Sequence, residues 1–166
     1  VYLYLGSHDS RITRSILRVE RSLRQAVPNI TLKVDPAITP DDLIAPLFVR
    51  EGVTEPQPIG SLPGVVQHSL DSLRAEVGEL ITLGIPSVIL FGVPEHKDAE
   101  GTGASDPDGI VQVALRDLRD TYGDEVVLIA DLCLDEYTDH GHCGLLTPAG
   151  QVDNDATLDR YAEVAV

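Results

Sequence analysis

Three short apolar segments alternate with three amphipathic segments along the chain, and this order restricts the fold more than any other feature of the sequence. The apolar segments, which predict buried strands, are Leu43 to Val49, Ser87 to Val93 and Glu125 to Asp131. The amphipathic segments, which predict helices, are Ser69 to Leu83, Ile110 to Tyr122 and a last one that begins near Asn154 or Asp155. Short turns precede the strands and long loops follow them, so the sequence predicts an α/β fold with a parallel sheet.

The strand and helix order alone does not decide how the sheet closes. A doubly wound sheet has the same order as a barrel of alternating strands and helices. The sequence G-x-G-x-x-G, which binds dinucleotides, does not follow the first strand, and its absence disfavours a dinucleotide site.

The first 35 residues predict a separate strand-helix-strand segment. Val1 to Leu5 and Ile30 to Val34 predict short strands, and Arg11 to Ala26 predicts a helix between them. His8, Asp9 and Ser10 are interpreted as a solvated turn and a helix cap. Proline and polar residues near Asp35 and Pro36 predict a boundary there, which divides the chain into residues 1–35 and residues 36–166.

Composition excludes several classes of function. The formal net charge is −15 over 166 residues, and nucleic-acid binding requires a basic surface instead. No apolar run approaches the ~18 residues of a membrane span, and no signal peptide is visible. Two cysteines without a disulfide framework indicate the reducing cytoplasm. The chain has no methionine and ends inside a helical pattern, which indicates a fragment of a longer reading frame.

The segment after the third predicted strand contains both cysteines of the chain. Cys133, Asp135 and Cys143 offer two thiolates and a carboxylate, which are zinc ligands. Three protein ligands leave one coordination position open, as in catalytic zinc sites. Two unpaired core cysteines beside solvated aspartates explain the same spacing, and both interpretations stay open at this point.

The whole segment Asp131 to Gly144 resembles the metal-binding loop of the porphobilinogen synthase (5-aminolevulinate dehydratase) family. The zinc-dependent members have D-x-C-L-C-x-Y-T-x-H-G-H-C-G, and this chain has D-L-C-L-D-E-Y-T-D-H-G-H-C-G. Asp135 replaces the middle cysteine, as in a subset of bacterial members with mixed ligands. Further matches follow in the family's order between residues 36 and 166: Leu43 to Val49, Ser61 to Val65, Leu90 to Pro94, Asp106 to Gly109 and Asn154 to Thr157.

The resemblance implies a partial TIM (β/α)8 barrel with about three of the eight units, preceded by a divergent N-terminal extension. It implies a lyase of heme biosynthesis that condenses two 5-aminolevulinate molecules into porphobilinogen with loss of two waters. It also implies a homo-octamer as the parent protein. The family's two active-site lysines have no match here, because Lys33 and Lys97 lie outside the matching segments. The isolated chain is therefore expected to be inactive, and an inactive metal-binding or interaction fragment is the alternative.

The resemblance also implies roles for individual residues. Cys133, Asp135 and Cys143 are expected to bind Zn2+, because two thiolates favour zinc over magnesium, although Mg2+ at other sites is compatible with the family. Asp131 is the candidate catalytic residue, with a strand-end hydrogen bond as its alternative role. His140 and His142 are interpreted either as partners of the ligands or as turn-stabilising residues. Residues 94–109 are interpreted as a solvated loop and a candidate lid.

Overall fold

The computed structural model describes residues 2–4, 31–33 and 39–165 of the chain. Strands β1 (Tyr2–Tyr4) and β2 (Thr31–Lys33) pair in parallel as a two-stranded sheet, which confirms the centres of the two short strands predicted at the N-terminus. The helix predicted at Arg11 to Ala26 and the turn at His8 lie outside the described residues.

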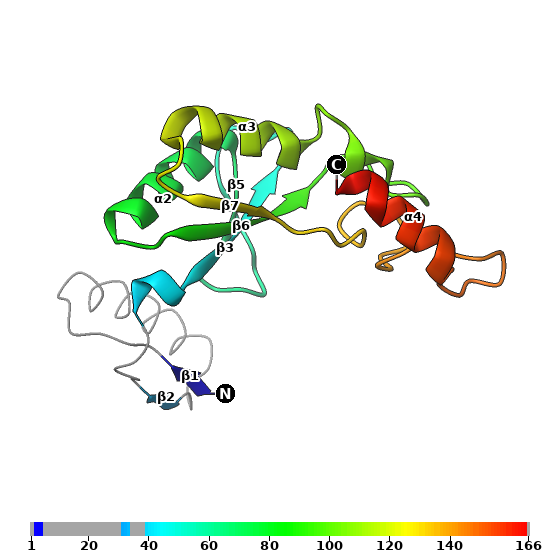
Figure 1. Cartoon of the computed structure of the whole chain (residues 1–166), viewed down its shortest axis with the longest axis horizontal. Helices are drawn as coiled ribbons and strands as arrows, with labels where there is room; N and C mark the ends of the chain where they lie inside the picture. The colour runs from blue at the N-terminus through cyan, green and yellow to red at the C-terminus, as the bar shows by residue number, and fades with distance from the viewer. Residues whose placement is uncertain (1, 5–30, 34–38, 166) are drawn as a thin grey trace.

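The main sheet has the order β4-β5-β3-β6-β7. Figure 1 shows it with helices α2 and α3 beside it. Its strands are β3 (Ile44–Arg50), β4 (Gln57–Pro58), β5 (Val66–His68), β6 (Ser87–Val93) and β7 (Val127–Ala130). β5, β3, β6 and β7 are parallel to their neighbours, whereas β4 is antiparallel to β5. The predicted parallel sheet is confirmed, and its third predicted strand is shorter than expected.

The described residues also include three α-helices and two short 3-10 helices. They are η1 (Pro40–Asp42), α2 (Leu70–Thr82), η2 (Thr102–Ser105), α3 (Ile110–Tyr122) and α4 (Asn154–Val164). The Ser69 side chain accepts a hydrogen bond from the backbone N–H of Ser72 and so caps α2. Gly84 follows the helix with a φ of 81°, a left-handed conformation that glycine adopts without strain. Both ends of α2 therefore follow from the sequence.

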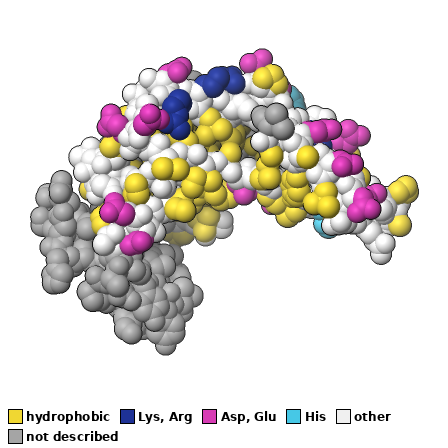
Figure 2. Space-filling model, in the orientation of Figure 1, with side chains coloured by type: hydrophobic (Ala, Val, Ile, Leu, Met, Phe, Trp, Pro, Cys, Tyr) yellow, Lys and Arg dark blue, Asp and Glu magenta, His cyan; other side chains and the backbone are white. Residues whose placement is uncertain are grey.

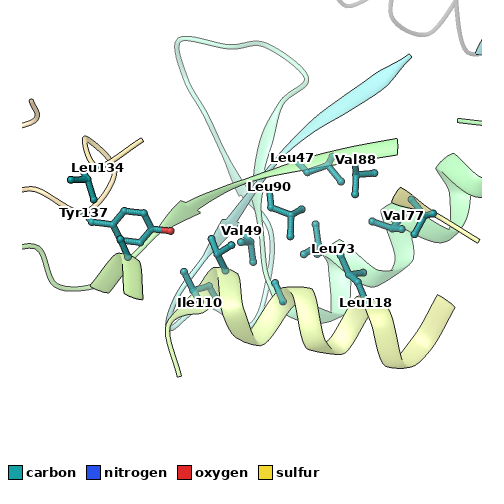
Figure 3. Packing of buried hydrophobic residues seen from close by; sticks show 14 residues of the cluster. Leu47, Val49, Leu73, Val77, Val88, Leu90, Ile110, Leu118, Leu134 and Tyr137 are labelled. Atoms are coloured by element: carbon teal, nitrogen blue, oxygen red, sulfur yellow. The ribbon is translucent and has the colours of Figure 1, made fainter. Parts of the chain in front are cut away.

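Helices α2 and α3 pack on the same face of the sheet. Leu73 and Val77 of α2 and Leu118 of α3 lie in one core with Val88 and Leu90 of β6, as Figure 3 shows. The strands β3, β6 and β7 follow one another across the sheet in chain order. A doubly wound sheet would reverse direction and place helices on both faces. Strand β5, however, lies on the other side of β3, so the strand order alone does not decide between a barrel and a doubly wound sheet. The placement of α2 and α3 on one face is the feature that favours a barrel.

The opposite face of the sheet has partly exposed apolar side chains. Along β6, Val88, Leu90 and Gly92 are buried, while the alternate residues Ile89 and Phe91 are half-buried. The ring of Phe91 lies 5.4 Å from the ring of Phe48 on β3. Within the described residues, helices α2 and α3 cover only one face of this strand. Figure 2 shows hydrophobic side chains along the concave lower side of the molecule.

The segment between β3 and α2 contains two strands that the sequence did not predict. Residues 51–63 are rich in proline and glycine, a composition that does not predict strands. Instead, Gln57 and Pro58 pair with Val66 and Gln67, and β5 pairs with the end of β3. Strands this short are defined by their partners rather than by their own composition. They extend the sheet on the side of β3 away from β6.

The described helices include none that is long and apolar enough to cross a lipid bilayer.

His68 gives this fold a testable pH dependence. Its side chain is 7% exposed, and burial lowers the pKa of His68 below the ordinary value, although nearby Glu76 opposes this shift. The unfolded chain therefore binds the proton more readily than the folded chain. The contribution of His68 to the free energy of unfolding is therefore greatest above the ordinary histidine pKa of about 6.5, and it decreases as the pH falls below that value. The raised pKa of Glu136 acts in the opposite direction over the same pH range, so the contribution of His68 is measured as a difference between the wild type and a variant.

Replacement of the histidine isolates this contribution. Between pH 7.5 and pH 5.5, the free energy of unfolding of His68→Gln should fall less, or rise more, than that of the wild type. His96→Gln, at an exposed histidine, should show the same change as the wild type. Equal pH dependence in the wild type and in His68→Gln would show that His68 does not cause it.

Candidate metal centre

The loop after β7 brings the three predicted ligands together. The Sγ atoms of Cys133 and Cys143 and a carboxylate oxygen of Asp135 all lie within 4.8 Å of one another. Cys133 is half-buried, and the other two are exposed. β7 and its neighbour β6 are parallel and end at the same edge of the sheet, where α/β proteins place their ligand-binding loops. The alternative of two unpaired core cysteines beside solvated aspartates does not hold for Cys143, which is exposed.

Buried residues between the ligands fix the shape of the loop. Leu134 and Thr138 are almost fully buried, with exposures of 0% and 1%. The backbone carbonyl of Leu134 accepts hydrogen bonds from the N–H groups of Tyr137 and Thr138, each at 2.9 Å. The Thr138 hydroxyl donates to the carbonyl of His142 at 2.9 Å. The two halves of the loop are thus joined, which places Cys143 beside Cys133.

The segment after β6 holds the loop from one side. The Asp98 N–H donates to the Tyr137 carbonyl at 3.3 Å, and the Asp139 N–H donates to the Asp98 carbonyl at 3.0 Å. The Asp98 carboxylate accepts from the hydroxyl and the N–H of Thr102 and from the N–H of Glu100, and these bonds lower the pKa of Asp98. The candidate lid is therefore hydrogen-bonded to the metal loop, and its movement stays a prediction.

Glu136 ties the loop to the end of β6. Its Oε2 atom accepts a hydrogen bond of 2.8 Å from the backbone N–H of Gly92. Burial, together with the nearby carboxylates of Asp131 and Asp135, raises the pKa of Glu136 to about 7. A divalent cation at the ligands would offset the mutual repulsion of these carboxylates.

The chemistry of the donor set fits zinc. Zinc binds thiolate, imidazole and carboxylate ligands, with Zn–S distances of about 2.3 Å, so small side-chain rotations would bring all three donors onto one ion. Burial and the neighbouring Asp135 side chain raise the pKa of the Cys133 thiol to about 12. Without a cation this thiol is therefore protonated at neutral pH, and metal binding must displace its proton.

The two histidines of the loop are joined by a hydrogen bond. The Nδ1 atom of His140 accepts a hydrogen bond from the His142 N–H at 3.1 Å, so Nε2 has the proton and donates to the Ala99 carbonyl at 3.2 Å. Both ring nitrogens of His140 are thus engaged, and the contacts favour the turn-stabilising interpretation. The candidate catalytic residue Asp131 lies at the end of β7, where its N–H donates to the Leu90 carbonyl at 3.1 Å.

Helix α4 contributes contacts that the sequence did not reveal. The Tyr161 hydroxyl donates to the Cys143 carbonyl at 2.5 Å and lies 4.0 Å from Cys133 Sγ. Burial and the nearby Cys133 sulfur raise the pKa of Tyr161, so the hydroxyl keeps its proton. The Thr157 hydroxyl accepts from the Leu145 N–H at 3.0 Å. No local pattern marks these residues, because their partners are 12 to 28 positions away.

Comparison with known proteins places this site in a family. The family model of delta-aminolevulinic acid dehydratase matches residues 16–166, which extends the resemblance before residue 36. The relative from Streptomyces coelicolor is 54% identical over 147 residues, or 87% of this chain and 44% of that protein. A relative from Mycobacterium tuberculosis is 51% identical over 148 residues, or 88% of this chain and 45% of that protein.

A solved structure has the same fold over almost the whole chain. It is the crystal structure of delta-aminolevulinic acid dehydratase (porphobilinogen synthase) from Toxoplasma gondii in complex with the reaction product porphobilinogen. It is 31% identical, with a TM-score of 0.74, and the match covers 96% of this chain and 43% of that one. The chain thus spans less than half of the length of the proteins that it matches. Because the family model covers most of the sequence, the chain belongs to the delta-aminolevulinic acid dehydratase family.

Proposed function

We propose that this chain is the metal-binding part of a porphobilinogen synthase. The whole protein would condense two 5-aminolevulinate molecules into porphobilinogen and release two waters. The observation that supports this proposal best is the convergence of Cys133, Asp135 and Cys143 within 4.8 Å in a chain of this family. The product bound to the Toxoplasma gondii relative is consistent with the same substrate class.

We propose that these three residues hold zinc. Two thiolates make the donor set soft, whereas magnesium prefers six oxygen ligands. When bound there, zinc would act as a Lewis acid that polarises a substrate carbonyl. Three protein ligands leave a position for that carbonyl, and the exposure of Asp135 and Cys143 leaves the site accessible.

Asp131 and Glu136 are proposed to prepare the site in different ways. The backbone of Asp131 is fixed by its bond to Leu90, and its carboxylate is placed at the strand end beside the loop, where it would orient the amine of the substrate. Glu136 is fixed on Gly92 and would add negative charge near the cation without being a ligand. These roles follow from position and charge.

Other features of the whole protein remain proposals of the same kind. The placement of α2 and α3 on one face of the sheet supports a partial TIM barrel, in which the half-buried face of Phe48 and Phe91 would become the barrel interior. We propose that the Schiff-base lysines lie in the part of the family sequence that this chain does not span. The boundary near residue 36, the cytoplasmic location and the homo-octamer stay predictions.

A chimera tests the proposed activity. Residues of this chain would replace the matching 147 residues of the Streptomyces coelicolor relative. We expect the chimera to form porphobilinogen from 5-aminolevulinate, and we expect the 166-residue chain alone to form none. The reason is that imine formation requires a positioned lysine amine, which the chimera obtains from the relative.

The controls separate the two candidate functions. A chimera that folds and binds zinc but forms no product would contradict the synthase proposal and favour the inactive metal-binding alternative. Product formation by the chain alone would instead direct attention to Lys33 or Lys97 as the amine.

A further inference from the structure

Tyr161 of α4 contacts both cysteines of the candidate metal centre. Its hydroxyl donates to the backbone carbonyl of Cys143 at 2.5 Å, and the same oxygen lies 4.0 Å from the sulfur of Cys133. The two cysteines are ten positions apart in the sequence. One phenol group therefore fixes the main chain at one ligand and packs against the sulfur of the other.

Helix α4 is held in place by contacts that do not involve this hydroxyl. Arg160, with a side chain only 10% exposed, donates from Nη2 to the Gly101 carbonyl at 3.0 Å and from Nε to the Glu100 carbonyl at 3.2 Å. The Asp153 side chain accepts from the Ala156 N–H and caps the helix. Removal of the Tyr161 hydroxyl should therefore leave α4 where it is.

Gly144 brings the helix close to the second cysteine. A Cβ atom at Gly144 would lie 2.5 Å from the Thr157 hydroxyl oxygen, so the backbone after Cys143 lies directly against α4. The Leu145 N–H donates to the same oxygen at 3.0 Å. Cys143 is exposed, but its carbonyl and the two residues that follow it contact α4.

We propose that Tyr161 is a positioning residue of the metal centre, which sets the separation of the two thiolates through the Cys143 carbonyl and the Cys133 sulfur. This inference rests on the proposed zinc site. Its physical basis is preorganisation: a ligand that is already oriented loses less conformational freedom when the metal binds. Loss of an outer hydrogen bond of this kind typically weakens metal binding by about 10- to 100-fold.

The variant Tyr161→Phe keeps the ring and removes only the hydroxyl. We expect its zinc affinity, measured by competition with a chelator, to be about 10- to 100-fold weaker than that of the wild-type chain. Cobalt(II) substitution gives a second measurement, because sulfur-to-cobalt charge-transfer absorption reports on the thiolates directly. We expect that absorption to shift in Tyr161→Phe, while the urea unfolding midpoint of the metal-free chain changes little.

A matched control exists at Tyr122, whose hydroxyl also donates to a backbone carbonyl, that of Arg74, at 2.6 Å. Tyr122→Phe should leave zinc affinity and the cobalt spectrum unchanged. If Tyr161→Phe kept the zinc affinity and the cobalt(II) spectrum of the wild type, the role of Tyr161 would be overturned, but the metal centre would not. A wild-type chain that shows no sulfur-to-cobalt absorption would overturn the metal centre itself, and the role of Tyr161 with it.

Discussion

Cys133→Ala and Cys143→Ala should each weaken zinc binding by about 100- to 1000-fold. Four-ligand zinc sites bind with about 10–16 kcal/mol, or roughly 3 kcal/mol for each ligand. Asp135→Ala should weaken binding less, because a carboxylate is the weaker zinc ligand, and Asp135→Cys should strengthen it. The measurement is competition with a chelator across the four variants.

A nearby aspartate provides the matched control. Asp139 is exposed, and its backbone N–H, which alanine retains, donates to the Asp98 carbonyl. Asp139→Ala should therefore keep wild-type zinc affinity. If all four ligand variants also kept it, the metal would lie elsewhere, and His96, His140 and His142 would be the next residues to test.

The same titration should depend on pH. Because the pKa of the Cys133 thiol is raised to about 12, the metal-free site holds this proton at neutral pH and releases it when zinc binds. Zinc affinity should therefore rise by at least about tenfold for each unit of pH increase near neutrality. An affinity independent of pH between 6 and 8 would exclude Cys133 as a ligand.

Gly92→Ala should destabilise the chain and weaken its zinc site together. A Cβ atom at Gly92 would lie 2.6 Å from the Tyr137 hydroxyl and 2.7 Å from a methyl carbon of Val111, both closer than atoms can approach. Overpacking of this kind costs about 1–3 kcal/mol. The Gly92 N–H also donates to Glu136, so the shift that relieves the contact moves the metal loop.

The appropriate comparison is Gly60→Ala, because nothing lies within 4 Å of a Cβ atom at Gly60. We expect Gly92→Ala to lower both the free energy of unfolding by urea and the zinc affinity. Gly60→Ala should change both quantities little. Equal behaviour of the two variants would show that β6 and the metal loop are not in close contact.

The regular elements could be predicted because their signals are local. The ends of β6 and α3 coincide with the predicted limits, and the Ser69 cap and Gly84 define α2. Apolar periodicity and end residues act within a few positions of the chain. The pairing of β5 with β3 depends on residues 19 positions apart, since Phe48 lies opposite Gln67, and the sequence of Gln57 or Val66 gives no sign of it.

The site could be predicted only in part, for the same reason. The spacing of Cys133, Asp135 and Cys143 lies within one loop, and the family resemblance specified their use. The contact between Gly92 and Glu136 joins residues 44 positions apart, and that between Tyr161 and Cys133 joins residues 28 apart. A glycine in a strand and a tyrosine on a helix are common core residues, so neither residue type indicates a metal centre.

X-ray absorption at the zinc edge of the zinc-loaded chain tests the central claim most directly. If Cys133, Asp135 and Cys143 bind the ion, the spectrum should contain two sulfur neighbours at about 2.3 Å and lighter neighbours at about 2.0–2.2 Å. Cys133→Ala should reduce the sulfur count to one. A first shell of oxygen and nitrogen alone, with no sulfur, would contradict the proposed metal centre.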